Sequence, residues 1–253
     1  MKFDERRTGA RHIGRTIRHF RSIDSTNAYA ASLADDPSQH GTVIIADEQL
    51  AGRGQYGRRW QAPAGTSVLL SVALFPPEHL RRPVPLTAWA TVAVAETVLQ
   101  ATAWQAAIKW PNDVLLLGRK ISGILIEQGK AVVLGIGLNV GQTADEFDRA
   151  GLPHAGSLES VTGLWFETEA ICEMLLMQLD EGYGKLAGGD IDDLAATWQW
   201  RLGLLGEHVV AEDGDGRTYR GILKEANFDA LVIEQAGSPT RLAPELVRSL
   251  TLQ

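Results

Sequence analysis

Residues 108–123 constrain the fold more than any other part of the chain. Two apolar runs in this stretch are separated by the sequence Lys-Trp-Pro-Asn-Asp at 109–113. Pro111 removes a backbone donor and forces the residue before it into an extended conformation. We therefore expect the chain to turn at Pro111 between two strands, which brings Lys120 back on the neighbouring strand.

The polar residues at this turn are unexpected in strands that only fill a core. The turn places Asn112 and Asp113 at a strand end, with Lys120 on the strand that follows. An amide, a carboxylate and an ammonium group at adjacent strand ends can together hold a metal-bound phosphate. The sequence therefore predicts that the reactive site of the protein lies at this turn.

The rest of the main domain shows a regular alternation of patterns. Short β-branched runs bounded by Gly or Pro predict strands, and longer apolar stretches without a breaker predict helices. We expect strands at 42–46, 67–75, 106–110, 114–117, 120–128 and 131–140, and helices at 86–103, 167–186 and 190–202. The turns between the four strands from 106 to 140 are short, which favours an antiparallel meander.

After Gly203 the pattern changes to short strands separated by Gly and Asp turns. These strands are expected at 207–211, 218–223, 230–234 and 240–242. Short strands repeated about every ten residues are typical of a small β-barrel. We therefore divide the chain into a basic N-terminal arm (1–21), a main domain (22–203) and a small C-terminal domain (204–253).

Charge and composition exclude several classes of protein. The formal net charge is -7, yet residues 1–22 carry seven Lys or Arg against two acidic residues, which is 7 − 2 = +5. We interpret this segment as a solvated arm, with nucleic-acid contact as the alternative, although a helix-turn-helix does not fit there. No apolar run reaches the roughly 20 residues of a membrane span. The single cysteine, Cys172, is expected to be buried and indicates a reducing, cytoplasmic location.

A second group of polar residues lies in the long loop 47–65. Residues 52–60, Gly-Arg-Gly-Gln-Tyr-Gly-Arg-Arg-Trp, contain three glycines and three arginines. Glycine lets the backbone approach a ligand, and its N–H groups can bind an anion together with Arg. The loop is neither a Walker A loop nor a dinucleotide fingerprint. A flexible surface loop that touches RNA is the alternative, but Trp60 offers a wall for an apolar ligand.

Two further segments present small or polar side chains. Ser25 and Thr26 precede a predicted helix, where they either cap the helix or hydrogen-bond the polar head of a ligand. Gly135 and Gly137 lie within a strand and allow a flat group to approach, and Asn139 adds a polar end. No His, Cys and Asp spacing indicates a structural zinc site.

Taken in order, these motifs resemble those of the biotin–protein ligases, or biotin–[acetyl-CoA-carboxylase] ligases. The resemblance runs from about residue 20 to 200, and residues 242–245 resemble the end of the small C-terminal domain of that family. The matching residues are Asp24-Ser25-Thr26-Asn27, Gln49, Gly52-Arg53-Gly54-x-x-Gly57-Arg58-x-Trp60, Lys109-Trp110-Pro111-Asn112-Asp113, Arg119-Lys120-x-x-Gly123-Ile124-Leu125-x-Glu127 and Gly135-x-Gly137-x-Asn139.

The resemblance implies an α+β fold and a two-step reaction. The main domain would be a class II aminoacyl-tRNA synthetase-like mixed sheet flanked by helices, followed by an SH3-like C-terminal barrel. The biotin carboxylate would attack the α-phosphorus of Mg²⁺-bound ATP to form biotinyl-5′-AMP. A lysine of biotin carboxyl carrier protein would then displace AMP. With little sequence before residue 24, we expect a ligase-only form that does not bind DNA.

The resemblance also assigns roles to single residues. Lys120, which would bridge the biotin carboxylate and the α-phosphate, and Arg53 are the expected catalytic residues, and Asp113 would hold the metal of Mg²⁺-ATP. Biotin would contact Ser25, Thr26, Gln49, Arg53, Trp60, Gly123 and Gly135. The nucleotide would contact Gly52, Gly54, Arg58, Asn112, Asp113, Lys120 and Asn139.

Several alternatives stay open at this point. Gln55 stands where such ligases often have a basic residue that retains the adenylate, so we expect weaker retention here. A lipoate or octanoyl ligase of the same fold is the nearest rival, and a non-catalytic biotin or adenylate binder is a rival of another class. A homodimer is a further expectation, since the apolar residues 130–140 fit either a strand that pairs two copies or the core.

Overall fold

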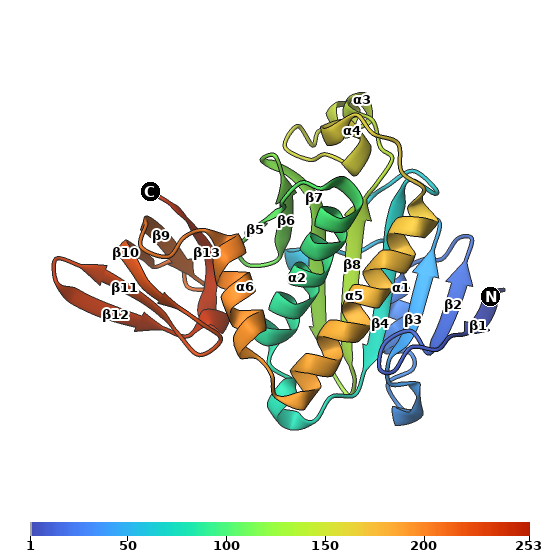
Figure 1. Ribbon diagram of the computed structural model, residues 1–253, viewed down its shortest axis with the longest axis horizontal. Coiled ribbons are helices and arrows are strands. Elements are labelled where there is room, and N and C mark those ends of the chain that lie inside the picture. The colour runs from blue at the N-terminus through green and yellow to red at the C-terminus, as the bar shows by residue number, and fades with distance from the viewer. Residues whose placement is uncertain (1) are drawn as a thin grey trace.

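An eight-stranded mixed sheet forms the centre of the main domain in the computed structural model, which describes residues 2–253 (Figure 1). Its strand order is β1-β2-β3-β4-β8-β7-β6-β5. Strands β2 and β3 run parallel, and all other neighbours run antiparallel. The strands are β1 Asp4–Arg7, β2 Thr16–Phe20, β3 Thr42–Ala46, β4 Ser67–Leu74, β5 Ala107–Lys109, β6 Asp113–Leu116, β7 Arg119–Gln128 and β8 Val132–Asn139.

Strands β5 to β8 confirm the predicted antiparallel meander. Lys109 pairs with Asp113 across the turn at Pro111, and Gly123 pairs with Gly137 between β7 and β8. Strand β8 lies between β4 and β7 and is buried along its whole length. The apolar residues near 130–140 therefore belong to the core, and this strand offers no free edge for pairing two copies.

Two long helices cover one face of this sheet, α2 (Pro83–Thr102) and α5 (Thr168–Gly188) (Figure 1). Val43 joins the core beneath them, whereas the next residue, Ile44, packs with Ala30 of α1 (Thr26–Ala31) on the opposite face. This follows from the alternation of side chains along a strand. The remaining helices are α3 (Ala144–Arg149), α4 (Leu158–Thr162) and α6 (Asp192–Leu202).

The core explains two features of the sequence. Helix α2 is long and apolar enough to cross a membrane by length and composition, but 67% of its apolar window is buried within the protein, as in a core helix. Cys172 of α5 is buried, as predicted, and burial raises the pKa of its thiol to about 12. The thiol is therefore held protonated and unreactive.

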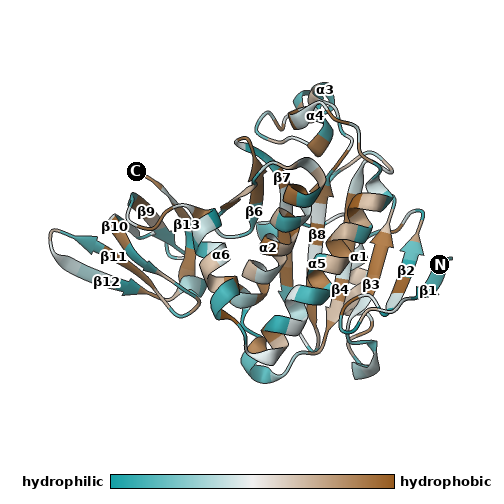
Figure 2. Ribbon diagram, viewed as in Figure 1, coloured by the Kyte–Doolittle hydropathy of each residue, from teal (hydrophilic) through white to brown (hydrophobic). Residues whose placement is uncertain are grey.

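Residues 4–7 and 16–20 form two strands of the large sheet, so the prediction of a separate basic arm is wrong for this segment. Strand β1 pairs with β2, and β2 pairs with β3. Ile17 and Phe20 are buried on opposite faces, and the basic side chains remain outside, where Arg18 pairs with Glu5 at 2.8 Å. Figure 2 shows this contrast, with polar colour on β1 and apolar colour along β3 and β4. The many charges masked the short strand pattern in the sequence.

The loop between β1 and β2 is held by one carboxylate of α5. Asp180 accepts hydrogen bonds from the backbone N–H groups of Arg11, His12 and Ile13 at 2.9, 2.6 and 2.8 Å. Burial of the carboxylate opposes its ionisation, but the three N–H donors outweigh burial and lower the pKa of Asp180. The ionised carboxylate therefore stabilises the folded state.

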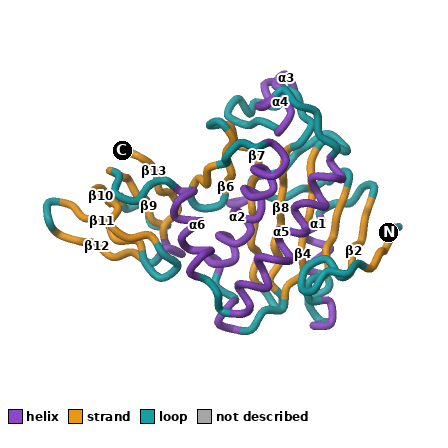
Figure 3. The backbone as a smooth tube through the Cα atoms, in the orientation of Figure 1, coloured by secondary structure: helices purple, strands orange, loops and turns teal. Residues whose placement is uncertain are grey.

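The C-terminal domain is a five-stranded antiparallel sheet in the order β12-β11-β10-β9-β13, and Figure 3 shows it as strands and loops beside the helices of the main domain. Its strands are β9 His208–Asp213, β10 Thr218–Ala226, β11 Leu231–Gln235, β12 Ser238–Leu242 and β13 Val247–Leu252. The first four confirm the predicted strands, and β13 was missed. Trp110, Trp198 and Phe228 join this sheet to the main domain, with ring centroids 5.8 and 5.5 Å apart.

Replacing Asp180 with Asn should destabilise the protein by about 1–2 kcal/mol at neutral pH, because a charged acceptor is lost from a partly exposed site. The pKa of Asp180 is lowered on folding, so its stabilisation is present above the ordinary carboxyl pKa and disappears as the pH falls through the lowered value. Urea unfolding of both proteins at pH 7 and at acid pH measures this difference. A difference that persists unchanged in acid would contradict it.

Candidate functional site

One cavity of about 710 Å³ collects nearly all the residues that the sequence singled out. It lies where loop 52–60, strands β7 and β8 and the turn at Pro111 meet. The predicted residues that line it are Ser25, Thr26, Gln49, Arg53, Gly54, Arg58, Trp60, Asn112, Asp113, Lys120, Gly123, Gly135 and Asn139. Gly52 does not line it and belongs to the wall of a neighbouring cavity of about 610 Å³.

The cavity is strongly cationic although the chain is acidic overall. Six Lys or Arg side chains line it against two carboxylates, which is 6 − 2 = +4, while the whole chain carries -7. Charge of one sign gathered in a cleft attracts a ligand of the opposite sign. The site is therefore suited to a polyanion. The charged lining residues are Arg53, Arg58, Arg59, Lys109, Lys120 and Arg248 against Asp113 and Glu212.

Loop 52–60 is closed by its own backbone. The N–H of Trp60 donates to the carbonyl of Gly52 at 3.1 Å, and the N–H of Gly54 donates to the carbonyl of Arg58 at 2.8 Å. At the tip, Tyr56 and Gly57 both have positive φ, 56° and 73°. The N–H of Gly54 is thus used within the loop, while Gly54 itself lines the cavity, so its contact with the nucleotide stays a prediction.

The Trp60 indole lies on two glycines of the sheet. A Cβ on Gly137 would lie 2.8 Å from Trp60 Cδ2 and closer still to Cε2, and a Cβ on Gly123 would lie 3.2 Å from Trp60 Cζ3. Only glycine allows the ring to reach this depth. The indole N–H is buried and has no hydrogen-bond partner among residues 2–253, which leaves it free for an acceptor on a ligand.

Gly135 makes room for a side chain rather than for a ligand alone. A Cβ at this position would lie 2.9 Å from Asn27 Cγ. The amide of Asn27 donates to Glu127 at 2.7 Å, and Glu127 also pairs with Arg53 at 3.2 Å. The Arg53 guanidinium is thereby held by Glu127. Asn27 and Glu127 stand within the motifs of the sequence, but the resemblance assigned no role to either residue.

A row of polar groups continues from Asn27 to Gln49. Ser71 donates to Asn27 Oδ1 at 2.5 Å and lies 2.7 Å from the hydroxyl of Thr26. Gln49 Oε1 accepts from the backbone N–H and the hydroxyl of Thr26 at 2.8 and 3.1 Å. Ser25 caps α1, as one reading of the sequence predicted. Within the part of the chain that the structure describes, neither the Gln49 NH₂ nor the Ser25 hydroxyl donates to the protein, so both can serve a ligand.

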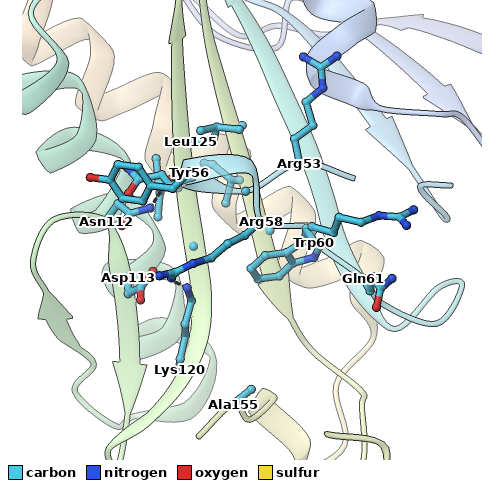
Figure 4. A pocket seen from close by; sticks show the side chains of 18 of the residues that line it. Arg53, Tyr56, Arg58, Trp60, Gln61, Asn112, Asp113, Lys120, Leu125 and Ala155 are labelled. Carbon is cyan, nitrogen blue, oxygen red and sulfur yellow. Dashed lines mark hydrogen bonds and ion pairs between the residues drawn. The ribbon is translucent and has the colours of Figure 1, made fainter. Parts of the chain in front are cut away.

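The turn at Pro111 brings together an ion pair. Lys120 Nζ lies 2.6 Å from Asp113 Oδ1, and Figure 4 shows Arg58 extending toward both residues while Arg53 points away from them. Asn112 ties the turn to β7, because its amide donates to the carbonyl of Ile124 at 2.5 Å. The structure thus brings Arg58, Asp113 and Lys120 together, places Arg53 elsewhere, and gives the Asn112 amide a structural bond.

Asn139 also has a structural role. Its amide donates to the carbonyl of Gly156 at 2.9 Å, and its oxygen accepts from Gln142 at 3.1 Å. The segment that it holds pairs with Lys120, whose N–H donates to the carbonyl of His154 at 2.9 Å. Residues 151–155 line the cavity on this side, although they belong to none of the motifs in the sequence.

The C-terminal domain contributes three residues to the cavity, Glu212, Arg248 and Ser249. They are placed there because the Trp110 indole N–H donates to the carbonyl of Val247 at 2.8 Å. Nothing in the local sequence around Arg248 indicates a site, since its position depends on how the two domains pack.

The cavity offers two carboxylates, Asp113 and Glu212, to the metal expected with the nucleotide. Residues 2–253 contain no group of three or more His, Cys, Asp or Glu that could hold a metal ion. Asp113 lines the cavity beside Lys120. Because Mg²⁺ is often held by one or two carboxylates and by substrate phosphates, this donor set fits a metal that arrives with a nucleotide.

The fold and this site define the class of the protein. A sequence model of the Biotin/lipoate A/B protein ligase family matches residues 19–141. A structure of the biotin protein ligase from Aquifex aeolicus in complex with biotin and ATP has the same fold, with a TM-score of 0.79 at 23% identity, over 94% of this chain and 99% of that chain.

Two relatives narrow the class further. The biotin–[acetyl-CoA-carboxylase] ligase of Mycobacterium tuberculosis is 33% identical over 225 residues, which cover 85% of this chain and 82% of that protein. The ligase of the same name from Paracoccus denitrificans is 33% identical over 240 residues, which cover 87% and 95%. The chain belongs to the biotin–protein ligase family, as the order of its motifs predicted.

Replacing Gly137 with Ala should destabilise the protein by about 1–3 kcal/mol, because the added methyl group overlaps the Trp60 ring and displaces it. Chemical unfolding followed by tryptophan fluorescence measures the change. Gly129→Ala in the same β7–β8 hairpin is the matched control, because its Cβ would lie 3.7 Å from its nearest neighbour, an ordinary contact. Equal stability of the two variants would show that Trp60 does not depend on Gly137.

Proposed function

We propose that this protein activates biotin with ATP to form biotinyl-5′-AMP and transfers biotin to a lysine of biotin carboxyl carrier protein. The observation that carries this proposal is the division of the cavity into two unlike ends. One end holds Lys120, Arg58 and Asp113, and the other holds the row of polar groups at Gln49. The apolar Trp60 ring lies on Gly137 and on Gly123, the glycine that Lys120 also approaches. Biotin has an anionic end and an apolar fused ring with a polar head, so it matches this division.

The polar groups at the far end fit the head of biotin. A ureido group offers one carbonyl oxygen and two N–H donors. The free NH₂ of Gln49 and the free hydroxyl of Ser25 can donate to such a carbonyl, and buried acceptors nearby can receive its N–H groups. The remaining biotin contacts that we propose are Thr26, the backbone of Arg53, Trp60, Gly123 and Gly135, all of which line the cavity.

Lys120 is the residue that we propose for the adenylation step. An oxygen of the biotin carboxylate forms a bond to the α-phosphorus of ATP while the bond to the β-phosphate oxygen breaks and pyrophosphate leaves. Two anions must meet, and a fixed ammonium group between them reduces their repulsion and stabilises the charge that develops. The Asp113 carboxylate at 2.6 Å holds Lys120 Nζ in the cavity, and Arg58 adds a second cation.

ATP brings the metal to this site in our proposal. Mg²⁺ neutralises phosphate charge when it is bound, and Asp113 is the residue that would hold it. Of the other residues predicted to contact the nucleotide, Asn112 and Asn139 support the site from its walls, and Gly52 and Gly54 shape the loop. Arg53, paired with Glu127, has a role secondary to that of Lys120 in the proposed chemistry.

The second step completes the proposed reaction. The amine of a carrier lysine attacks the carbonyl carbon of the mixed anhydride, an amide bond forms and AMP leaves. The names of the two relatives, which specify acetyl-CoA carboxylase, support a biotin carboxyl carrier protein as the partner. We also propose a cytoplasmic location, since the thiol of Cys172 is free, as expected in a reducing compartment.

The two domains also suggest to which folds the protein is related. We infer that the main domain is related to class II aminoacyl-tRNA synthetases, and that the five-stranded C-terminal sheet is SH3-like. We propose that residues 4–20 do not bind DNA. Their charged side chains belong to an edge strand of the sheet and its surroundings. A homodimer would have to use a surface other than the buried strand β8.

The proposed function is tested by ATP–pyrophosphate exchange with either biotin or lipoate as the acid. We expect exchange with biotin and none with lipoate, because the head of biotin fits the polar row at Gln49 and Thr26 whereas a dithiolane ring has no polar groups for it. Exchange with lipoate alone would establish a lipoate ligase. No exchange with either acid would favour a protein that binds biotin without activating it.

Replacing Lys120 with Ala should reduce biotin-dependent exchange at least about 100-fold, as expected for the loss of a preorganised charge at the reacting groups. Lys130→Ala is the matched control, because Lys130 pairs with Asp35 on the surface and both side chains are largely exposed. Circular dichroism of both variants checks the fold. Near-normal exchange by Lys120→Ala would remove Lys120 from the proposed mechanism.

A further inference from the structure

The tip of loop 52–60 contacts the C-terminal domain through one pair of side chains. The Arg248 guanidinium carbon lies 4.4 Å from the centroid of the Tyr56 ring. A cation at this distance over an aromatic face is attracted by the ring. Both residues line the cavity, although they lie 192 positions apart (248 − 56). We propose that this pair is a clamp by which the C-terminal domain holds the loop closed over the reactive end of the site.

Arg248 is placed by a rigid anchor. Its neighbour Val247 is buried, and the carbonyl of Val247 accepts the hydrogen bond of the Trp110 indole at 2.8 Å. Trp110 itself is buried and packs on Trp198. The strand that carries Arg248 is therefore fixed to the Pro111 turn, beside Asp113. The C-terminal domain can act on the loop because it is fastened to the same turn that carries the reactive residues.

Tyr56 depends on a partner outside the loop. Its side chain is 60% exposed, and its φ of 56° lies in the left-handed region that aromatic residues rarely adopt. Apart from the short turn bonds of the loop, no hydrogen bond of Tyr56 to the rest of residues 2–253 accounts for this conformation. The contact with Arg248 adds to the turn bond between the Arg58 N–H and the Gln55 carbonyl in holding it, since an unfavourable backbone conformation persists when the surroundings hold it.

The clamp deepens the proposed function and rests on it. The loop carries both Arg58 and Trp60 into the cavity, so an open loop would release whatever lies beneath it. Gln55, at the tip, has no charge with which to hold an adenylate. We infer that Tyr56 and Arg248 retain the reactive intermediate by holding the loop closed.

Hydrogen–deuterium exchange tests the clamp without any ligand, so its outcome does not depend on the proposed function. Arg248→Met keeps the length of the side chain and removes its charge. We expect the hydrogen-bonded amides within residues 53–58, those of Gly54 and Arg58, to exchange roughly three to ten times faster in this variant, the change expected for one cation–π contact. Arg220→Met, at an exposed arginine of the same sheet outside both cavities, should leave these amides unchanged.

A double-mutant cycle on the release of biotinyl-5′-AMP tests the role of the clamp. Tyr56→Leu and Arg248→Met should each speed release by about three- to tenfold, and the double variant should be no faster than either one, because both remove the same contact. Tyr56→Phe keeps the aromatic face and should behave as the natural protein.

Three results would overturn the clamp. The first is an unchanged amide exchange rate within residues 53–58 in Arg248→Met. The others are a release rate in the double variant equal to the product of the two single effects, and release of biotinyl-5′-AMP by Tyr56→Phe as fast as by Tyr56→Leu. If the protein makes no adenylate at all, the proposed function fails and hydrogen–deuterium exchange still decides whether the clamp exists.

Discussion

The Trp60 indole, seated on Gly137 and Gly123, is the contact on which the rest of the site depends. It fastens a long polar loop to the centre of the large sheet, where the backbone of β7 and β8 is buried and regular. Because the loop is also closed between Gly52 and Trp60, this one aromatic ring fixes the base of the loop that carries Arg58 and Tyr56. An aromatic residue suits the task, since its large apolar surface is buried with few side-chain torsions to restrict.

Two separate ion pairs lie near the Trp60 ring. Lys120 is held by Asp113 at the reactive end, and Arg53 is held by Glu127 near the polar row. Both pairs are partly exposed, so their contribution to stability is small and their value lies in position. Each carboxylate keeps a cation in place until an anionic ligand competes for it. The excess of cations in the cavity of an acidic protein is the electrostatic condition for binding a nucleotide beside a carboxylate.

Much of this arrangement could be predicted because it depends on local backbone constraints. The turn at Pro111, the meander from β5 to β8, the core helices and four strands of the second sheet all follow from periodicity and from Gly and Pro. The small strand β2 was hidden because it has only two apolar residues, Ile17 and Phe20, and lies among the basic residues of the N-terminal segment, so it was interpreted as part of a basic arm. Strand β13 was missed because its alternation is short and follows a turn at Pro244.

The sequence by itself determined which residues gather in the cavity, since Lys120, Asp113, Arg58 and Trp60 all stand in motifs whose residue types fit one task. Only the tertiary structure decided what each glycine and amide does. Gly135 admits Asn27, Gly137 seats Trp60, and Asn112 and Asn139 fasten neighbouring segments. It also brought Arg248 to the site from a second domain. The reason is physical: a motif records which groups are present, but contacts between distant segments arise only when packing brings their surfaces together.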